Sequence, residues 1–161
     1  MPEMTLLGWF HTVLGVLAVL SGFYTLFKYK IISLKEDSGK LYVLVTLIVA
    51  GSALGIYNQG GFGVAHILAV LTLIALAGGV LMEKTNLFGP FSKYFQALGY
   101  TTTLLFHMIP AITDFLRRLP VGDPFIDSFE DPLLLNFHLA FLLIYVVILI
   151  AQMVWLKRSQ L

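Results

Sequence analysis

The chain has 161 residues, of which 58% are hydrophobic and only 12% charged, and its mean hydropathy is +0.89. A soluble domain is about a quarter charged and about half apolar, so the excess apolar surface is expected to face lipid. The formal net charge of +1 and aromatic residues confined to apolar runs argue against nucleic acid as a partner. The absence of cysteine excludes disulfides, thiolate-ligated haem and iron–sulfur clusters held by cysteine.

Five apolar runs predict five transmembrane helices, because about 20 helical residues cross the hydrocarbon core of a bilayer. The runs cover residues 6–27, 41–57, 62–82, 94–116 and 133–156, and residues 117–132 form a loop before the last run. The break between the second and third runs is Asn58-Gln59-Gly60-Gly61, and the fourth run is the least hydrophobic. We therefore expect an all-α, polytopic transmembrane bundle of five helices that forms a single domain over residues 1–161.

The distribution of basic residues predicts the orientation, because cytoplasmic loops retain Lys and Arg. With five spans, eight of the ten basic residues fall on one side: Lys28, Lys30, Lys35, Lys40, Lys84, Lys93, Lys157 and Arg158. Arg117 and Arg118 fall on the other side, in the loop 117–132. This pattern predicts an N-terminus outside and a cytoplasmic C-terminus, and we expect an integral protein of a bacterial cytoplasmic membrane.

The second run contains Gly51 and Gly55 in a G-x-x-x-G spacing. Small residues four apart on one helix face let another helix approach closely in lipid. The pair predicts a packing surface, either for another helix of the chain or for a second copy in a homo-oligomer.

Four of the five runs each carry one histidine, and polar ionisable groups inside a membrane are costly and often functional. At about 1.5 Å per residue, His11 and His138 lie roughly 8 Å below the outer ends of their helices and His66 about 6 Å. His107 lies about 14 Å below, still within an outer half of the hydrocarbon that is about 15 Å deep. All four histidines are therefore expected in the outer leaflet.

Helical spacing also predicts which faces point inward. The first run has a stripe of small residues around its histidine: Gly8, His11, Gly15, Ala18 and Gly22. The fourth has a polar face of Tyr100, Thr103, His107 and Asp114, and the fifth has His138, Tyr145 and Gln152 seven residues apart. These patterns predict that the histidines face the interior of the bundle.

Two or more of the four histidines are expected to hold a metal or cofactor, with Gly15 leaving room beside His11. Asp114 is a further candidate metal ligand. The alternative for Asp114 is an ion pair with Arg117 or Arg118, three and four residues further along the same helix. Haem b is the first expectation, because imidazoles from facing helices are common axial ligands of haem iron.

On this pattern of histidines and glycines, the chain resembles the b-type cytochromes of membranes, including cytochrome b561-like proteins and the half-bundle of haem A synthases. The resemblance implies that His11 or His66 pairs with His107 or His138 as axial ligands, in electron transfer with a quinone or a partner protein. The chain departs from cytochrome b561-like proteins, which carry haems on both sides of the membrane, since its histidines share one side. The stretch around His11, Gly15 and Gly22 also looks like uncharacterised bacterial multi-helix membrane proteins.

Two alternatives to haem stay open, one of them an enzyme. Histidines with Asp114 are suitable ligands for Zn, with bound water as a hydrolytic nucleophile, or for Cu with Met108 as a soft ligand. In the other alternative there is no cofactor, and the histidines serve as a protonatable relay or as hydrogen-bonding contacts in a small structural or assembly subunit.

Overall fold

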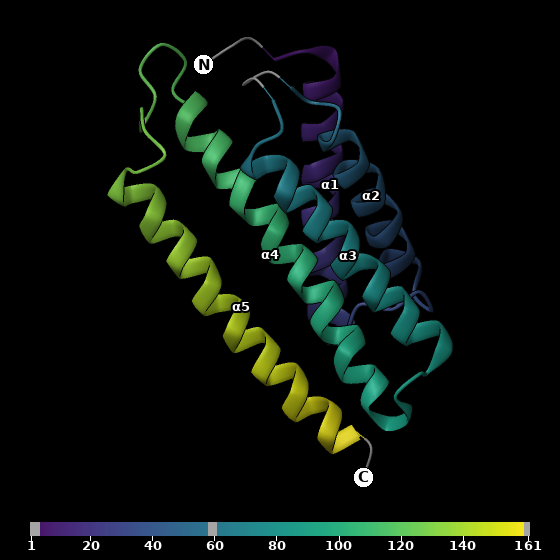
Figure 1. Cartoon of the computed structure of the whole chain (residues 1–161). Helices are drawn as coiled ribbons and strands as arrows, with labels where there is room; N and C mark the ends of the chain where they lie inside the picture. Colours follow the sequence, from purple (N-terminus) through teal and green to yellow (C-terminus); the bar gives the residue numbers. More distant parts are fainter. Residues whose placement is uncertain (1–3, 58–60, 160–161) are drawn as a thin grey trace.

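The computed structural model describes residues 4–57 and 61–159, and within these residues the chain forms five α-helices and no strand (Figure 1). The helices are α1 (Leu6–Tyr29), α2 (Asp37–Ala53), α3 (Val64–Thr85), α4 (Ser92–Arg118) and α5 (Pro132–Ser159), with a short 3₁₀ turn η1 (Gly89–Phe91) before α4. The all-α prediction is confirmed. Helices suit this composition, because every backbone polar group within a helix finds its partner in the same segment.

The helices follow the predicted order, with one notable difference at the end of α2. The apolar run continues to residue 57, but the helix ends at Ala53. Beyond it the backbone turns more tightly, with the amides of Gly55 and Ile56 donating to carbonyls three residues earlier. Gly51 and Gly55 therefore do not share a helix face. Asn58, Gln59 and Gly60 lie outside the described residues.

Three of the helices, α1, α3 and α5, are long and apolar enough to cross a membrane. This finding supports an integral membrane protein. The remaining two lie alongside them (Figure 1): α2 has 17 residues, and α4 has 27 residues with many polar side chains. Helix α1 begins at one end of the bundle and α5 finishes at the other, which we call the N-terminal end and the C-terminal end.

Helix α4 lies at the centre of the packing. The most extensive contacts are those of α3 with α4 and of α1 with α2, and α5 packs chiefly on α4. Gly99 of α4 permits a close approach to α3, since a Cβ added there would meet the Ala75 carbonyl oxygen at 2.7 Å and the Gly79 nitrogen at 2.9 Å. The backbones of α3 and α4 are thus in direct contact.

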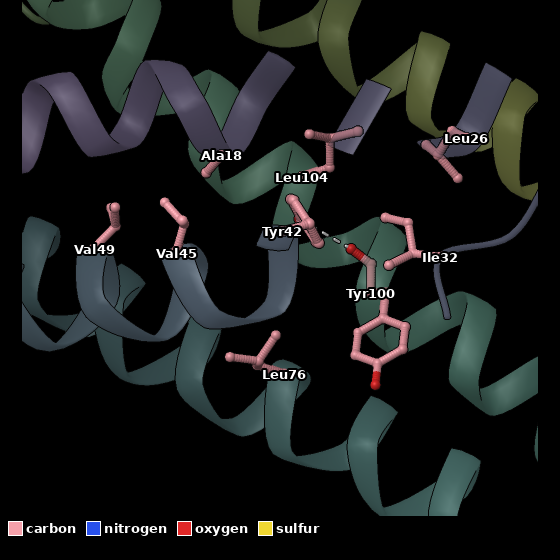
Figure 2. Packing of buried hydrophobic residues seen from close by; sticks show 9 residues of the cluster. All are labelled: Ala18, Leu26, Ile32, Tyr42, Val45, Val49, Leu76, Tyr100 and Leu104. Atoms are coloured by element: carbon pink, nitrogen blue, oxygen red, sulfur yellow. Dashed lines mark hydrogen bonds between the residues drawn. The ribbon is translucent and has the colours of Figure 1, made fainter. Parts of the chain in front are cut away.

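The buried core lies among α1, α2, α3 and α4 and contains two tyrosines with no exposed surface, Tyr42 and Tyr100. Figure 2 shows Tyr42 between α1 and α4, with its hydroxyl directed to the backbone carbonyl of Tyr100. The ring of Tyr42 lies against Gly22, where an added Cβ would come within 2.7 Å of it. The small-residue stripe of α1 thus receives a side chain of α2.

Candidate functional site

One face of α2 carries polar groups that receive both histidines of the bundle interior. Tyr42, Thr46 and Ser52 lie on this face, together with the carbonyl of Val49. His11 of α1 contacts Val49 and Ser52, and His107 of α4 contacts Thr46. Positions 46 and 49 are separated by about 4.5 Å along the helix axis. The two histidines therefore bind α2 within one helical turn of each other.

The hydrogen bonds of His11 determine which ring nitrogen carries its proton. Nδ1 lies 3.1 Å from the Val49 carbonyl oxygen and 3.1 Å from Ser52 Oγ. A carbonyl only accepts, and the Ser52 hydroxyl already donates to Val49, so Nδ1–H of His11 is the donor. The lone pair of neutral His11 is then on Nε2.

His107 is 7% exposed, and its Nε2 lies 3.0 Å from Thr46 Oγ1. The carboxylate of Asp114 is half exposed and lies 3.6 Å from Nε of Arg118. The ion pair expected as the alternative role for Asp114 is therefore present.

Further along, Tyr42 joins α2 to α4. Its hydroxyl lies 2.6 Å from Thr103 Oγ1, and both hydroxyls approach the carbonyl oxygen of Tyr100, at 3.4 and 2.7 Å. The predicted polar face of α4 is confirmed for Tyr100, Thr103 and His107, all of which are buried. Asp114 lies at its exposed end.

Glu83 near the end of α3 accepts three hydrogen bonds. Tyr100 Oη donates to Oε2 at 2.9 Å, while Ser33 Oγ and the Leu34 amide donate to Oε1 at 2.6 and 2.8 Å. The sequence pattern offered no reason to single out Glu83, because a carboxylate beside Lys84 at the end of an apolar run is typical of a residue at the membrane–water interface. Thr46 was missed too, although its helical spacing from Tyr42 was a usable signal.

These side chains form a series through the bundle interior, from the N-terminal to the C-terminal end. We call them the polar file: Ser52, His11, His107, Thr46, Tyr42, Thr103, Tyr100, Glu83 and Ser33. The file is not one continuous hydrogen-bonded series. His11 and His107 bond to α2 separately, and at Tyr100 the carbonyl accepts from Thr103 while the phenol donates to Glu83.

His66 lies outside the polar file, at the start of α3. Its ring lies between Tyr57 and Phe62, with centroid distances of 4.6 and 5.0 Å, and its Nδ1 accepts from the Gly63 amide. Its Nε2 is buried and makes no hydrogen bond with residues 4–57 or 61–159. His66 therefore belongs to an aromatic cluster near the N-terminal end.

The predicted inward face of α5 is confirmed, since each of its three polar residues meets a threonine of α4. His138 Nε2 lies 3.2 Å from Thr113 Oγ1, the Tyr145 hydroxyl 2.8 Å from Thr102 Oγ1, and Gln152 Oε1 accepts from Thr101 at 2.8 Å. His138 is thus engaged between α4 and α5, away from the contacts of His11 and His107 with α2.

The metal centre expected from the sequence would bring several of the four histidines and Asp114 together. Within residues 4–57 and 61–159, no three His, Asp or Glu side chains are grouped to hold a metal ion. His11 and His107 are the histidines that meet on one face of α2. At Gly15, four residues from His11, an added Cβ would contact nothing within 4 Å. That Gly15 makes room for a cofactor beside His11 stays a prediction.

The comparisons with known proteins yield no relative: no model of a protein family, no curated protein and no solved structure matches the chain.

Proposed function

We propose that this protein is a five-span integral membrane protein, with its N-terminus outside and C-terminus cytoplasmic, and that its polar file is a proton relay. The observation that carries the proposal is the docking of His11 and His107 within one turn of α2, at the head of a buried series of hydroxyls. Buried ionisable groups in membrane helices mark proton and ion pathways, because their desolvation is otherwise costly.

The orientation is supported by charge. The C-terminal end carries eight of the ten basic residues and three of the nine acidic ones, Glu36, Asp37 and Glu83. The loop between α4 and α5 at the other end is acidic. A basic end retained in the cytoplasm places His11, His107 and Asp114 toward the outside.

In this relay Asp114 is the half-exposed carboxylate at the outer entrance. The free Nε2 of His11 accepts a proton to give an imidazolium, whose Nδ1–H bond to Val49 is unchanged. His107 is the next basic group, and its Nε2 shares a proton with the Thr46 hydroxyl. Tyr42 and Thr103 continue the series, and Glu83 accepts at the other end.

Tyr100 is the controlling residue of the relay. A carbonyl oxygen accepts hydrogen bonds but donates none. The hydrogen bonds of Tyr42 and Thr103 to the Tyr100 carbonyl therefore provide no path for a proton toward Glu83. Transfer to Glu83 then requires that the hydroxyl of Tyr42 or Thr103 be connected to the phenol of Tyr100 by a rearrangement of the side chains or by water. In this proposal, the arrangement without that connection is the closed form of the relay.

The test is proton flux into proteoliposomes, driven by a potassium diffusion potential and followed with an internal pH dye. Protons are expected to enter liposomes that contain the wild type faster than they enter empty liposomes. His11→Gln and His107→Gln are expected to reduce this flux at least tenfold. His138→Gln is the matched control. His138 lies outside the polar file, so this variant should conduct protons as fast as the wild type. Flux equal to that of empty liposomes, or equal in the two file variants and wild type, overturns the proposal.

A haem or metal at His11 and His107 is the second candidate. It is favoured by the Nδ1–H bond of His11 to a carbonyl, which is the usual outer contact of a metal-binding histidine and leaves Nε2 available. Bound haem supplies one-electron chemistry, with a quinone or a redox protein as partner. For His107 to offer Nε2 as well, it must release Thr46.

An absorption spectrum of the purified protein, oxidised and dithionite-reduced, with metal analysis on the same sample, separates the candidates. A Soret band lost in both His11→Gln and His107→Gln identifies the pair as haem ligands. Stoichiometric Zn or Cu without that band identifies a metal site. A colourless, metal-free protein that conducts protons supports the relay alone.

A further inference from the structure

An apolar groove runs along the bundle surface between α1, α4 and α5. Its larger part, with a volume of about 200 Å³, is formed by α1 and α5 and lies toward the C-terminal end. A smaller part, with a volume of about 100 Å³, continues along α4 and α5 toward the middle of the bundle. Both parts are lined by Phe23 and Ile148, so they adjoin. The groove reaches from Phe141 to Trp155, which is about 21 Å along α5.

The lining of the groove suits a hydrocarbon chain. It is almost entirely apolar, and its main polar side chains already have partners. Gln152 accepts from Thr101 and donates to the Lys30 carbonyl, and Tyr145 bonds to Thr102. An occupant therefore finds few unsatisfied hydrogen-bonding groups along the groove walls. Its length exceeds the roughly 15 Å thickness of one hydrocarbon leaflet, so one acyl chain can lie along it.

The mouth of the groove at the C-terminal end is basic. Lys30 lines it directly, and three further exposed basic residues occupy the last turns of the two flanking helices: Lys28, Lys157 and Arg158. Of the three acidic residues at this end, Asp37 pairs with Lys40 at 2.7 Å and Glu83 is engaged by Ser33 and Tyr100. Among the described residues, Lys30 forms no ion pair with these two or with Glu36.

We propose that this groove is a binding site for an anionic phospholipid of the leaflet at the C-terminal end, with an acyl chain between Phe23 and Ile148 and the phosphate at Lys30. Basic pockets between helices on the cytoplasmic side of a membrane attract acidic headgroups, and each Lys near the surface adds to the attraction. This step rests on the orientation proposed above, which places the C-terminal end in the cytoplasm. The site is separate from the polar file and does not depend on the proposed relay.

Trp155 provides a direct probe, because it lines the groove and the chain contains one other tryptophan, Trp9. In a Trp9→Phe background, Trp155 fluorescence is measured in phosphatidylcholine bilayers that contain brominated phosphatidylglycerol or, separately, brominated phosphatidylcholine. We expect the anionic lipid to quench Trp155 with an apparent affinity about fivefold higher, the ratio expected for one basic side chain near the headgroup. Equal quenching by the two lipids overturns the proposal.

Two matched pairs of variants locate the effect. Lys30→Gln should abolish the preference, whereas Lys84→Gln removes the same charge from the same end but away from the groove, and should keep it. Ala151→Phe fills the groove and should reduce quenching by both lipids, whereas Val147→Phe introduces the same side chain on an exposed face of α5 and should not. If Lys84→Gln acts as strongly as Lys30→Gln, the attraction is a general surface effect and the site does not exist.

Discussion

Helices α4 and α5 are neighbours of nearly equal length, 27 and 28 residues, yet their surfaces are opposite in character. Helix α4 is the less apolar and has nine buried residues, including Gln96, Thr101 and His107. Helix α5 is far more apolar apart from the three polar residues that face α4, and only Leu134, Gln152 and Leu156 are buried. The more polar helix therefore lies inside the bundle and the more apolar helix lies at its edge.

The difference follows from the solvent. In lipid an apolar side chain gains little by moving from hydrocarbon to a protein interior, so apolar residues do not drive helices together. Close backbone contact and hydrogen bonds do. Helix α4 meets α3 at Gly99 and meets α2 through His107 and Thr103, whereas α5 is joined to α4 by three polar pairs. Substitutions that weaken these contacts should therefore differ in their effect on stability, with Glu83→Ala the largest and His138→Ala the smallest.

Glu83→Ala should be the most destabilising, by about 3 kcal/mol or more. It leaves the donors of three part-buried hydrogen bonds, those of Ser33, Leu34 and Tyr100, without their acceptor. A donor left unsatisfied in the interior costs about 1–3 kcal/mol. The measurement is reversible unfolding in mixed micelles with increasing SDS. Lys84→Ala, on an adjacent exposed residue, is the control and should change little. Equal stability of the two variants would show that these three hydrogen bonds contribute nothing.

Gly99→Ala should cost about 1–3 kcal/mol in the same assay, because the added methyl meets backbone atoms that move only with the helix. The matched control is Gly78→Ala on α3, where an added Cβ contacts nothing within 4 Å. A neutral Gly99→Ala would contradict the direct contact of α3 with α4.

The contact of Gln152 with Thr101 should contribute about 0.6 kcal/mol, and at most about 1.7, as membrane hydrogen bonds generally do. A double-mutant cycle with Gln152→Leu and Thr101→Val isolates this coupling. Because Gln152 also donates to the Lys30 carbonyl, the single Gln152→Leu variant should lose more than the coupling energy. A coupling of zero would leave α5 without its expected attachment at the C-terminal end.

His138→Ala should have the smallest effect, about 0.6 kcal/mol or less, because its bond to Thr113 is long, at 3.2 Å, and partly exposed. Unfolding of the single variant and of Thr113→Val provides the comparison. A loss as large as that of Glu83→Ala would indicate that His138 has a role beyond this contact.

Sequence periodicity correctly predicted the features that depend on a single helix. The inward face of α5 and the buried face of α4 follow from spacing alone, because a helix presents residues seven apart on the same side. The partners could not be predicted in this way. The contact of His107 with Thr46 depends on the packing of α2 against α4. Two of the three bonds of Glu83 depend on the loop after α1, and the third depends on the packing of α3 against α4. The end of α2 at Ala53 was missed because apolar residues continue past it.

The expectation of four gathered histidines shows the same limit. Their depths are similar, but depth does not determine the position around the bundle. His11 and His107 share one face of α2, His66 lies between Tyr57 and Phe62, and His138 meets Thr113. Only the packing distinguishes the pair from the other two.

The central claim is that α2 and α4 cross the membrane with the three more apolar helices and so hold the polar file within it. Because the natural chain has no cysteine, single cysteines can be introduced at Lys35, Ile56, Leu87 and Asp123, and labelled in intact cells with a membrane-impermeant maleimide. The account predicts labelling from outside at positions 56 and 123, and at 35 and 87 only after the membrane is opened. Labelling of all four positions from the same side would contradict it.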